Sequence, residues 1–181
     1  MMTFAYGLQH VSQGWVAAVA TEHGLCALVL PRRECRDVEL TILRSYPDAV
    51  YDQDRFTDIL SRLKRYFSGE RMEFPDAVDV GTATAFRQEV WRAARQIPYG
   101  ETRSYAWLAE RINRPRAARA VGQALGENPI PLVIPCHRIV GSGGDLRGFA
   151  DGLEMKASLL ALERPRITHR CTTRAADPAY L

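Results

Sequence analysis

The chain has 181 residues, of which 46% are hydrophobic and 25% are charged, and its formal net charge at pH 7 is +3. This composition is ordinary for a globular protein, and the length allows one large domain or two small ones. No stretch is long and apolar enough to cross a membrane. No basic residue precedes the short apolar run 15–20, so we expect no secretory signal. The four cysteines, Cys26, Cys35, Cys136 and Cys171, lack the dense spacing of a disulfide framework, so we expect reduced thiols and a cytoplasmic protein.

The charge is unevenly distributed along the chain. Residues 1–80 hold 9 Arg and Lys against 12 Asp and Glu, whereas residues 81–181 hold 15 against 9. A basic second half is compatible with an anionic partner such as nucleic acid. A solvated surface without a partner explains the same numbers, and on charge alone it is the better explanation.

The first part of the chain is predicted to be a sheet followed by a helix. The apolar runs "GWVAAVA" (14–20) and "GLCALVL" (24–30) are joined by a short turn, which predicts a hairpin. Residues 56–70 have apolar side chains at helical spacing and a glycine near the end, which predicts an amphipathic helix. Residues 71–83 show no period, and we place a domain boundary there.

The second part is predicted to be mostly helical. Thr84 is placed to cap a helix over "AFRQEVWRAARQI", and Ser104 is placed to cap "YAWLAERI". A turn, "NRPR", and a short helix, "AARAVGQAL", follow, which predicts a helix-turn-helix, although any pair of packed helices gives the same pattern. The last of these helices carries small residues and two arginines, a surface able to approach another surface closely: Ala117, Ala118, Ala120, Gly122, Ala124, Arg116 and Arg119.

Three further segments complete the expected architecture. The glycine-rich stretch "GSGGDLRG" (141–148) lacks the spacing of a phosphate-binding loop. Residues 153–163 form a last helix, and the tail after it is expected to be poorly ordered. The predicted fold is therefore α+β, with a sheet-and-helix domain (1–80), a mostly helical domain (81–165) and a tail (166–181).

Cys136 stands in an unusual setting, "IPLVIPCHRIV" (130–140). A thiolate is the nucleophile, so a cysteine with a free pKa of about 8.5 needs a base, and His137 is adjacent. Neighbouring side chains of an extended strand point to opposite faces, so contact between the two needs a turn or a bridging water. A carboxylate should orient the histidine, and spacing alone leaves Asp145, Asp151, Glu154 and Glu163 open.

The stretch "NPIPLVIPCHRIV" (128–140) resembles the active-site signature of the O6-alkylguanine-DNA alkyltransferases, the methylated-DNA–protein-cysteine methyltransferases. The segments "FRQEVWRAARQIPYGETRSYAWLA" (86–109), "RAARAVGQALGENP" (116–129) and "LRGFADGLEMKASLLALE" (146–163) resemble the same family, so the likeness covers most of residues 84–164. It implies a DNA repair protein that transfers an alkyl group irreversibly to its own cysteine, without a cofactor and for a single turnover.

The resemblance implies how double-stranded DNA is bound. The helix-turn-helix would enter the minor groove, where its small residues fit, and O6-alkylguanine, as well as O4-alkylthymine, would be flipped out of the duplex. Arg119 matches the finger that fills the gap left by the flipped base. Tyr105 matches the tyrosine that helps to rotate the nucleotide and donates a proton toward guanine N3.

The resemblance also assigns the reacting groups. Cys136 matches the alkyl acceptor, His137 the histidine that deprotonates it through a water, and Glu163 the carboxylate that orients that histidine. Asn128 matches the hinge asparagine between the helix-turn-helix and the active-site segment. The protein is expected to be a monomer in solution.

Some residues depart from the family's pattern or invite another interpretation. Asp151 stands where many members have a small residue, and a carboxylate in the pocket wall would narrow it or repel bulky adducts; Trp107 replaces a polar or small residue. Some relatives hold a structural zinc in the first domain, but His10, His23, Cys26 and Cys35 are poorly spaced for one, so we expect no metal.

Three other functions are compatible with parts of the sequence. A non-enzymatic lesion binder of the alkyltransferase-like kind would lack the acceptor cysteine, which is present here. A transcriptional regulator with a zinc-binding first domain would need a cysteine cluster, and residues 1–80 hold two cysteines. A thiol hydrolase would show turnover on esters or amides.

Overall fold

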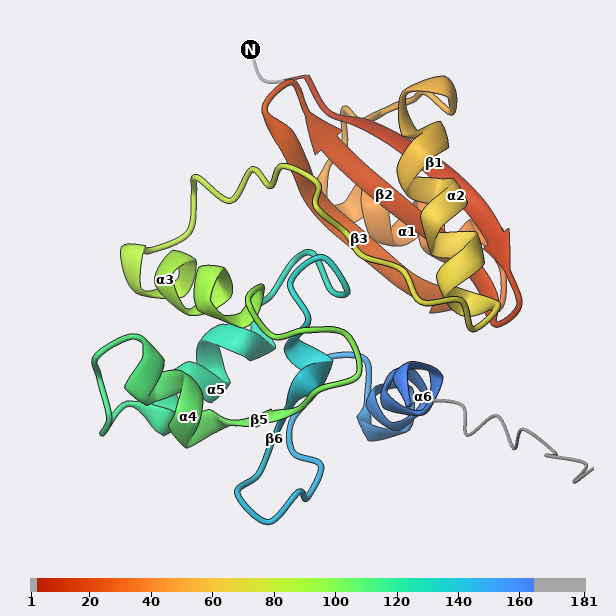
Figure 1. Ribbon diagram of the computed structural model, residues 1–181. Helices are drawn as coiled ribbons and strands as arrows, with labels where there is room; N and C mark the ends of the chain where they lie inside the picture. Colours follow the sequence, from red (N-terminus) through yellow and green to blue (C-terminus); the bar gives the residue numbers. More distant parts are fainter. Residues whose placement is uncertain (1–2, 165–181) are drawn as a thin grey trace, which may run out of the picture.

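A four-stranded sheet organises the first half of the chain in the computed structural model, which describes residues 3–164 (Figure 1). The strands β1 (Ala5–Val11), β2 (Gly14–Thr21), β3 (Gly24–Arg32) and β4 (Val50–Tyr51) have the order β3-β2-β1-β4. The β2–β3 pair confirms the predicted hairpin, and β1 extends it as a third antiparallel strand, whereas β4 pairs with β1 in parallel.

Helices cover both faces of this sheet. The side chains of β2 alternate, so that Val16 and Ala18 belong to one buried cluster and Ala17 and Val19 to another. The first face packs against α2 (Thr57–Phe67), which follows the short 3₁₀ helix η1 (Asp54–Phe56), and the second against α1 (Cys35–Ser45). The predicted helix over 56–70 is confirmed, but α1 was not predicted.

Short helices dominate the second half. These are α3 (Ala85–Ala94), α4 (Tyr105–Arg111), α5 (Ala118–Gly126), the 3₁₀ turn η2 (Cys136–Arg138) and α6 (Leu153–Glu163). The two-residue strands β5 (Arg103–Ser104) and β6 (Ile139–Val140) pair in parallel. The predicted caps are confirmed: Thr84 Oγ1 accepts from Arg87 N, and Ser104 Oγ accepts from Trp107 N. The architecture is therefore α+β, as expected.

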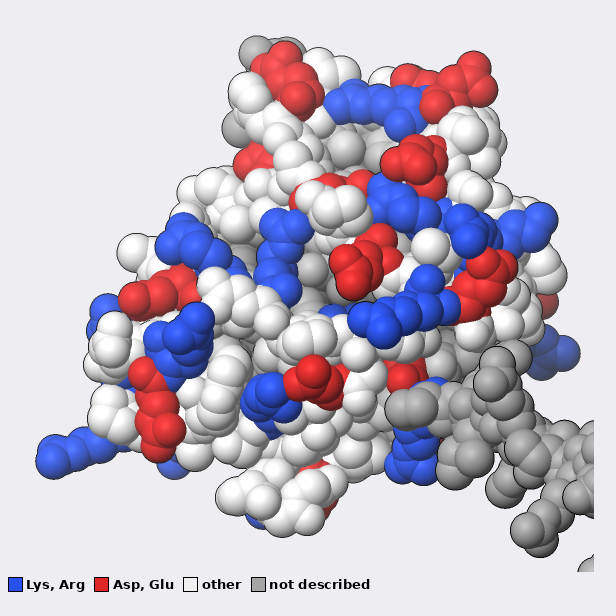
Figure 2. Space-filling view, viewed as in Figure 1, with Lys and Arg blue, Asp and Glu red and all other residues white. Residues whose placement is uncertain are grey.

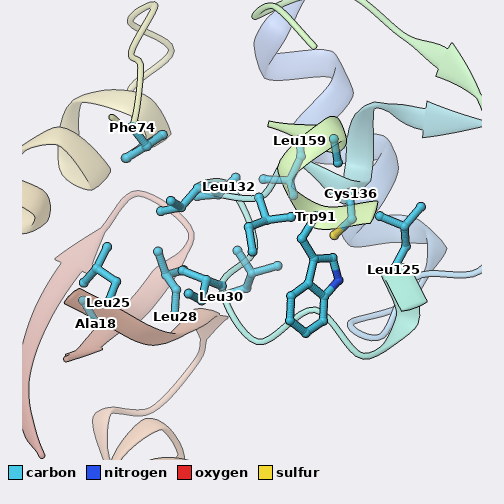
Figure 3. Packing of buried hydrophobic residues seen from close by; sticks show 14 of the residues in the cluster. Ala18, Leu25, Leu28, Leu30, Phe74, Trp91, Leu125, Leu132, Cys136 and Leu159 are labelled. Carbon is cyan, nitrogen blue, oxygen red and sulfur yellow. The ribbon is translucent and has the colours of Figure 1, made fainter. Parts of the chain in front are cut away.

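The segment that links the two halves is attached to the sheet. Leu25 N donates to Ala77 O, and Asp79 N donates to Leu25 O, so residues 77–79 run along β3. The buried core also continues from one half to the other: Figure 3 shows Leu28 and Leu30 of β3 in the same cluster as Trp91 and Leu132. Apolar burial across this boundary holds the second half against the sheet.

The surface carries both signs of charge. On the face shown in Figure 2, basic and acidic side chains are interspersed and form no single basic patch. Among residues 3–164, no helix combines the length and the apolar character that a membrane crossing needs. The predicted tail (166–181) and Cys171 lie outside the described residues.

Candidate active site

Cys136 begins a tight turn, one of the two arrangements that contact with His137 was expected to need. The η2 turn follows Pro135 and ends where β6 begins, and Cys136 N donates to Ile134 O at 2.8 Å. A 3₁₀ turn has three residues per turn, so successive side chains are separated by about 120° rather than lying on opposite faces. The turn therefore removes the constraint that would place the two side chains on opposite faces, while His137 Nδ1 makes no hydrogen bond to the thiol.

The thiol of Cys136 is buried and has one polar side-chain partner. Asn128 Nδ2 donates to Cys136 Sγ at 3.1 Å and to Ile134 O at 2.8 Å, while Asn128 Oδ1 accepts from Ile130 N. Burial raises the pKa of the thiol to about 11, although the Asn128 hydrogen bond and the charge of Lys156 oppose the shift. A thiol with a pKa this far above neutrality is almost entirely protonated at pH 7, so nucleophilic reaction requires a base to remove its proton.

His137 is fully buried and is oriented by Glu163. The distance from His137 Nε2 to Glu163 Oε1 is 2.9 Å. Hydrogen bonds from His137 and Arg138 hold the pKa of the Glu163 carboxyl at about 2, despite its burial. An ionised carboxylate only accepts, so Nε2 carries the proton, and Nδ1, which is buried without a protein partner, is the free acceptor. Burial lowers the pKa of His137, which keeps the ring neutral and able to accept a proton at pH 7.

Glu163 binds more groups than the sequence indicated. Arg138 Nε and Nη2 donate to its two oxygens at 2.8 and 2.9 Å, Gly100 N donates to Oε2 at 3.1 Å, and the Tyr66 hydroxyl donates to Oε1 at 3.0 Å. Arg138 and Glu163 balance each other's charge while His137 is neutral. An arginine inside the apolar run "IPCHRIV" was the signal for such a partner, whereas nothing in the sequence pointed to Tyr66.

Tyr105 and a buried lysine lie on another side of the cysteine. The Tyr105 hydroxyl donates to Arg147 O at 2.9 Å, and Lys156 Nζ lies 2.8 Å from that carbonyl and 3.5 Å from the hydroxyl. Burial raises the pKa of Tyr105, so its proton is retained at neutral pH. Lys156 is fully buried on α6 and was also missed, because a lone lysine between Met155 and Ala157 resembles an ordinary solvent-exposed position of an amphipathic helix.

A cavity of about 730 Å³ opens between α4, α5 and the glycine-rich loop. Tyr105, Ala118, Arg119 and Gly122 line it, together with the loop residues 147–150. A side chain at Gly122 would contact the Tyr105 ring, because a Cβ there would lie 3.6 Å from a ring carbon. Arg119 is exposed on α5, while the small residues Ala117, Ala118, Ala120 and Gly122 are partly exposed.

Asp151 is engaged with the first half of the chain. Arg32 Nη2 at the end of β3 donates to Asp151 Oδ1 at 2.6 Å, and Asp151 is absent from the lining of the cavity, which includes Ala150. Its charge nevertheless acts on the Cys136 thiol and contributes to the raised pKa of that group, so an effect of Asp151 on adduct size stays a prediction.

Two of the four residues considered for a metal make other contacts, whereas Cys26 and Cys35 are free thiols. His10 contacts the Trp15 ring, with 5.2 Å between ring centroids, and His23 pairs with Glu22. Within residues 3–164, no group of three or more His, Cys, Asp or Glu side chains has the arrangement of a metal site.

Comparison with known proteins gives consistent matches. The family described as "6-O-methylguanine DNA methyltransferase, DNA binding domain" matches residues 85–165. A methylated-DNA--protein-cysteine methyltransferase of Mycolicibacterium paratuberculosis is 47% identical over 138 residues, which cover 71% of this chain and 82% of the relative. A protein of the same name from Methanosarcina acetivorans is 44% identical over 118 residues, covering 65% and 75%.

A solved structure matches nearly the whole chain. The crystal structure of Mycobacterium tuberculosis OGT in complex with DNA has a TM-score of 0.76 and 36% identity, and the match covers 88% of this chain and 92% of that one.

Proposed function

The chain belongs to the methylated-DNA–protein-cysteine methyltransferase family, and from this we propose that it repairs alkylated DNA by transferring the alkyl group to Cys136. Its substrate would be double-stranded DNA that contains O6-alkylguanine or O4-alkylthymine. The transfer is irreversible, so each molecule reacts once. The cysteine itself accepts the alkyl group, and no cofactor takes part.

The observation that carries this proposal is the surroundings of the Cys136 thiol. It is buried against Asn128 and directly precedes a neutral histidine whose tautomer is fixed by an ionised carboxylate. The free Nδ1 of His137 accepts the thiol proton through a water, and the resulting imidazolium and thiolate compensate each other's charge. Glu163 then stabilises the imidazolium, which is the role of the third member of a nucleophile–base–carboxylate set.

The transfer step balances in atoms and electrons. The thiolate of Cys136 attacks the alkyl carbon, a carbon–sulfur bond forms, and the bond between that carbon and O6 breaks with its electron pair passing to the guanine. The Tyr105 hydroxyl donates a proton toward N3, which makes guanine a better leaving group. The product thioether has no easy route back to a thiol, so turnover stops.

DNA recognition is assigned to α4 and α5 as a helix-turn-helix that enters the minor groove. The partly exposed small residues Ala118, Ala120 and Gly122 of α5, with Ala117 just before it, let the helix approach the groove floor. Arg119 at the edge of the cavity fills the stack after the base has flipped. Base flipping is needed because the reacting atom lies inside the base pair. A minor-groove-binding dye should compete with the protein for duplex DNA, whereas a major-groove ligand should not.

The last proposals concern the domain boundaries, the cellular location and the oligomeric state. Residues 1–80 and 81–165 are proposed as two domains that share a continuous core, and the protein is proposed to act as a cytoplasmic monomer. Sedimentation velocity of the protein alone tests the monomeric state.

The function is tested by stoichiometry in an excess of lesion. Incubation with a molar excess of O6-methylguanine duplex should consume one lesion per protein molecule and then stop. Cys136→Ala should bind the duplex without consuming any lesion, whereas Cys26→Ala and Cys35→Ala should react as the parent does. Continued turnover, or transfer by the Cys136 variant, would reject the proposal.

A further inference from the structure

Glu163 accepts a hydrogen bond from the opposite half of the protein. Tyr66 lies on α2, 97 positions away in the sequence, and its hydroxyl donates to Glu163 Oε1 at 3.0 Å. His137 Nε2 contacts the same oxygen at 2.9 Å. Arg138 Nη2 donates to this oxygen as well, at 2.9 Å, so Tyr66 and His137 are two of three donors that share Oε1. Negative charge that the Tyr66 hydroxyl withdraws from Oε1 is not available to His137.

The Tyr66 ring is fixed by packing. It is fully buried, and it contacts Phe67, Phe74 and Tyr99 edge-on, with centroid distances of 5.3, 5.8 and 6.3 Å. Burial and the neighbouring Glu163 raise the pKa of Tyr66, so its hydroxyl stays protonated and remains a donor at every pH of interest. The position of that hydroxyl is thus set by packing within the first half, to which α2 belongs, and against Tyr99 of the second half.

We propose that Tyr66 is a positioning residue for alkyl transfer: its hydroxyl fixes the Glu163 carboxylate and thereby sets how strongly His137 holds a proton. The proposal rests on the proposed function, since it concerns the same cysteine and histidine. It also gives the first half of the chain a part in the chemistry, because α2 supplies a group that the second half lacks.

The direction of the effect follows from the charges around the ring. The charged groups that act on His137 are Glu163, Arg138 and Lys156. Those facing Tyr66 are Glu163 and Arg138, with Tyr99 as a further titratable neighbour. The Tyr66 hydroxyl withdraws negative charge from Oε1, so its removal leaves a carboxylate that attracts the imidazolium proton more strongly. His137 would then remain protonated to a higher pH, and the base would be unavailable there.

The test measures the reactivity of Cys136 without DNA. Iodoacetamide alkylation of Cys136 is followed by peptide mass spectrometry from pH 4 to 9, in the parent and in Tyr66→Phe. The acidic limb of the rate profile, which reports the pKa of His137, should move upward in Tyr66→Phe by less than about one pH unit. Loss of one hydrogen bond to a carboxylate shifts the pKa of that carboxylate by about one unit, and His137 receives a part of this effect through Glu163. Tyr46→Phe is the matched control. It removes another tyrosine hydroxyl of the first half, which donates to Cys26 O and not to Glu163, so the acidic limb of the rate profile should stay at the parent pH.

Two further measurements separate positioning from simple support of the fold. In a Glu163→Gln background, Tyr66→Phe should shift nothing, because the two changes act through one carboxylate and are not additive. Difluorotyrosine at position 66 keeps the shape of the side chain nearly unchanged and makes the hydroxyl a stronger donor, so the acidic limb should move to lower pH. This variant provides the test if Tyr66→Phe folds poorly.

The outcomes are distinct from those of the functional test. An unmoved limb in Tyr66→Phe, or an equal shift in the Glu163→Gln background, would overturn the positioning role. A protein that shows the predicted limb shift but leaves O6-methylguanine duplex unreacted would overturn the proposed function and retain the link between Tyr66 and His137.

Discussion

Replacing Glu163 by glutamine should cost a large part of the stability of the protein at neutral pH. The folded structure holds the carboxyl pKa at about 2, against 4.5 for the free group, a difference of about 2.5 units. At 1.36 kcal/mol per unit this corresponds to about 3 kcal/mol of stabilisation. Loss of one partner of a buried ion pair costs about 3–5 kcal/mol, which agrees, because Arg138 would be left charged and buried.

The pH dependence gives the prediction its sign. A depressed carboxyl pKa stabilises the folded state fully above about pH 4.5, and the contribution is lost as the pH falls toward 2. Urea unfolding of the parent and Glu163→Gln should therefore differ by about 3 kcal/mol at pH 7, and the difference should narrow between pH 5 and pH 2.

An exposed ion pair provides the control for this measurement. Glu70→Gln breaks a pair with Arg65 in which both side chains are about half exposed, and it should cost less than about 1 kcal/mol. A loss below about 1 kcal/mol for Glu163→Gln at pH 7, or a loss that stays constant down to pH 3, would refute the assignment of Glu163 as an ionised, buried partner.

Two other substitutions test different parts of the account. Arg119→Ala should react slowly with alkylated duplex DNA but at nearly the parent rate with a free alkylated guanine base, and low salt should not restore the duplex rate; full recovery would make Arg119 a phosphate contact instead. Asn128→Ala should raise the pKa of the Cys136 thiol further and slow alkyl transfer at neutral pH, because the thiol loses its hydrogen-bond donor. The protein should also lose about 1–3 kcal/mol of stability, because Ile134 O loses its donor. An unchanged pH–rate profile would show that the amide does not act on the sulfur.

The elements that the sequence predicted are those with strong local signals. The hairpin β2–β3 follows from two apolar runs around a short turn, and the helix starts at Thr84 and Ser104 follow from cap residues. The helix α1 was missed because it buries only Val38 and Ile42, too few apolar positions to make a periodic stripe.

The candidate site was recognised through one contiguous stretch and completed only by tertiary structure. "PCHR" drew attention to Cys136 and His137, but their relative geometry depended on a 3₁₀ turn that an apolar run does not signal. The partners Tyr66 and Lys156 come from α2 and α6, in segments whose local pattern indicates ordinary amphipathic or apolar helices. The pairing of Asp151 with Arg32 had no local signal, because the two residues are 119 positions apart in the sequence.

The central claim is that Cys136 itself receives the alkyl group. Intact-mass measurement after incubation with O6-methylguanine duplex, followed by peptide mapping, tests it most directly. The account predicts one added methylene per molecule, located on the peptide that contains Cys136. An unmodified mass, more than one methylene, or modification at Cys26, Cys35 or Cys171 would contradict it.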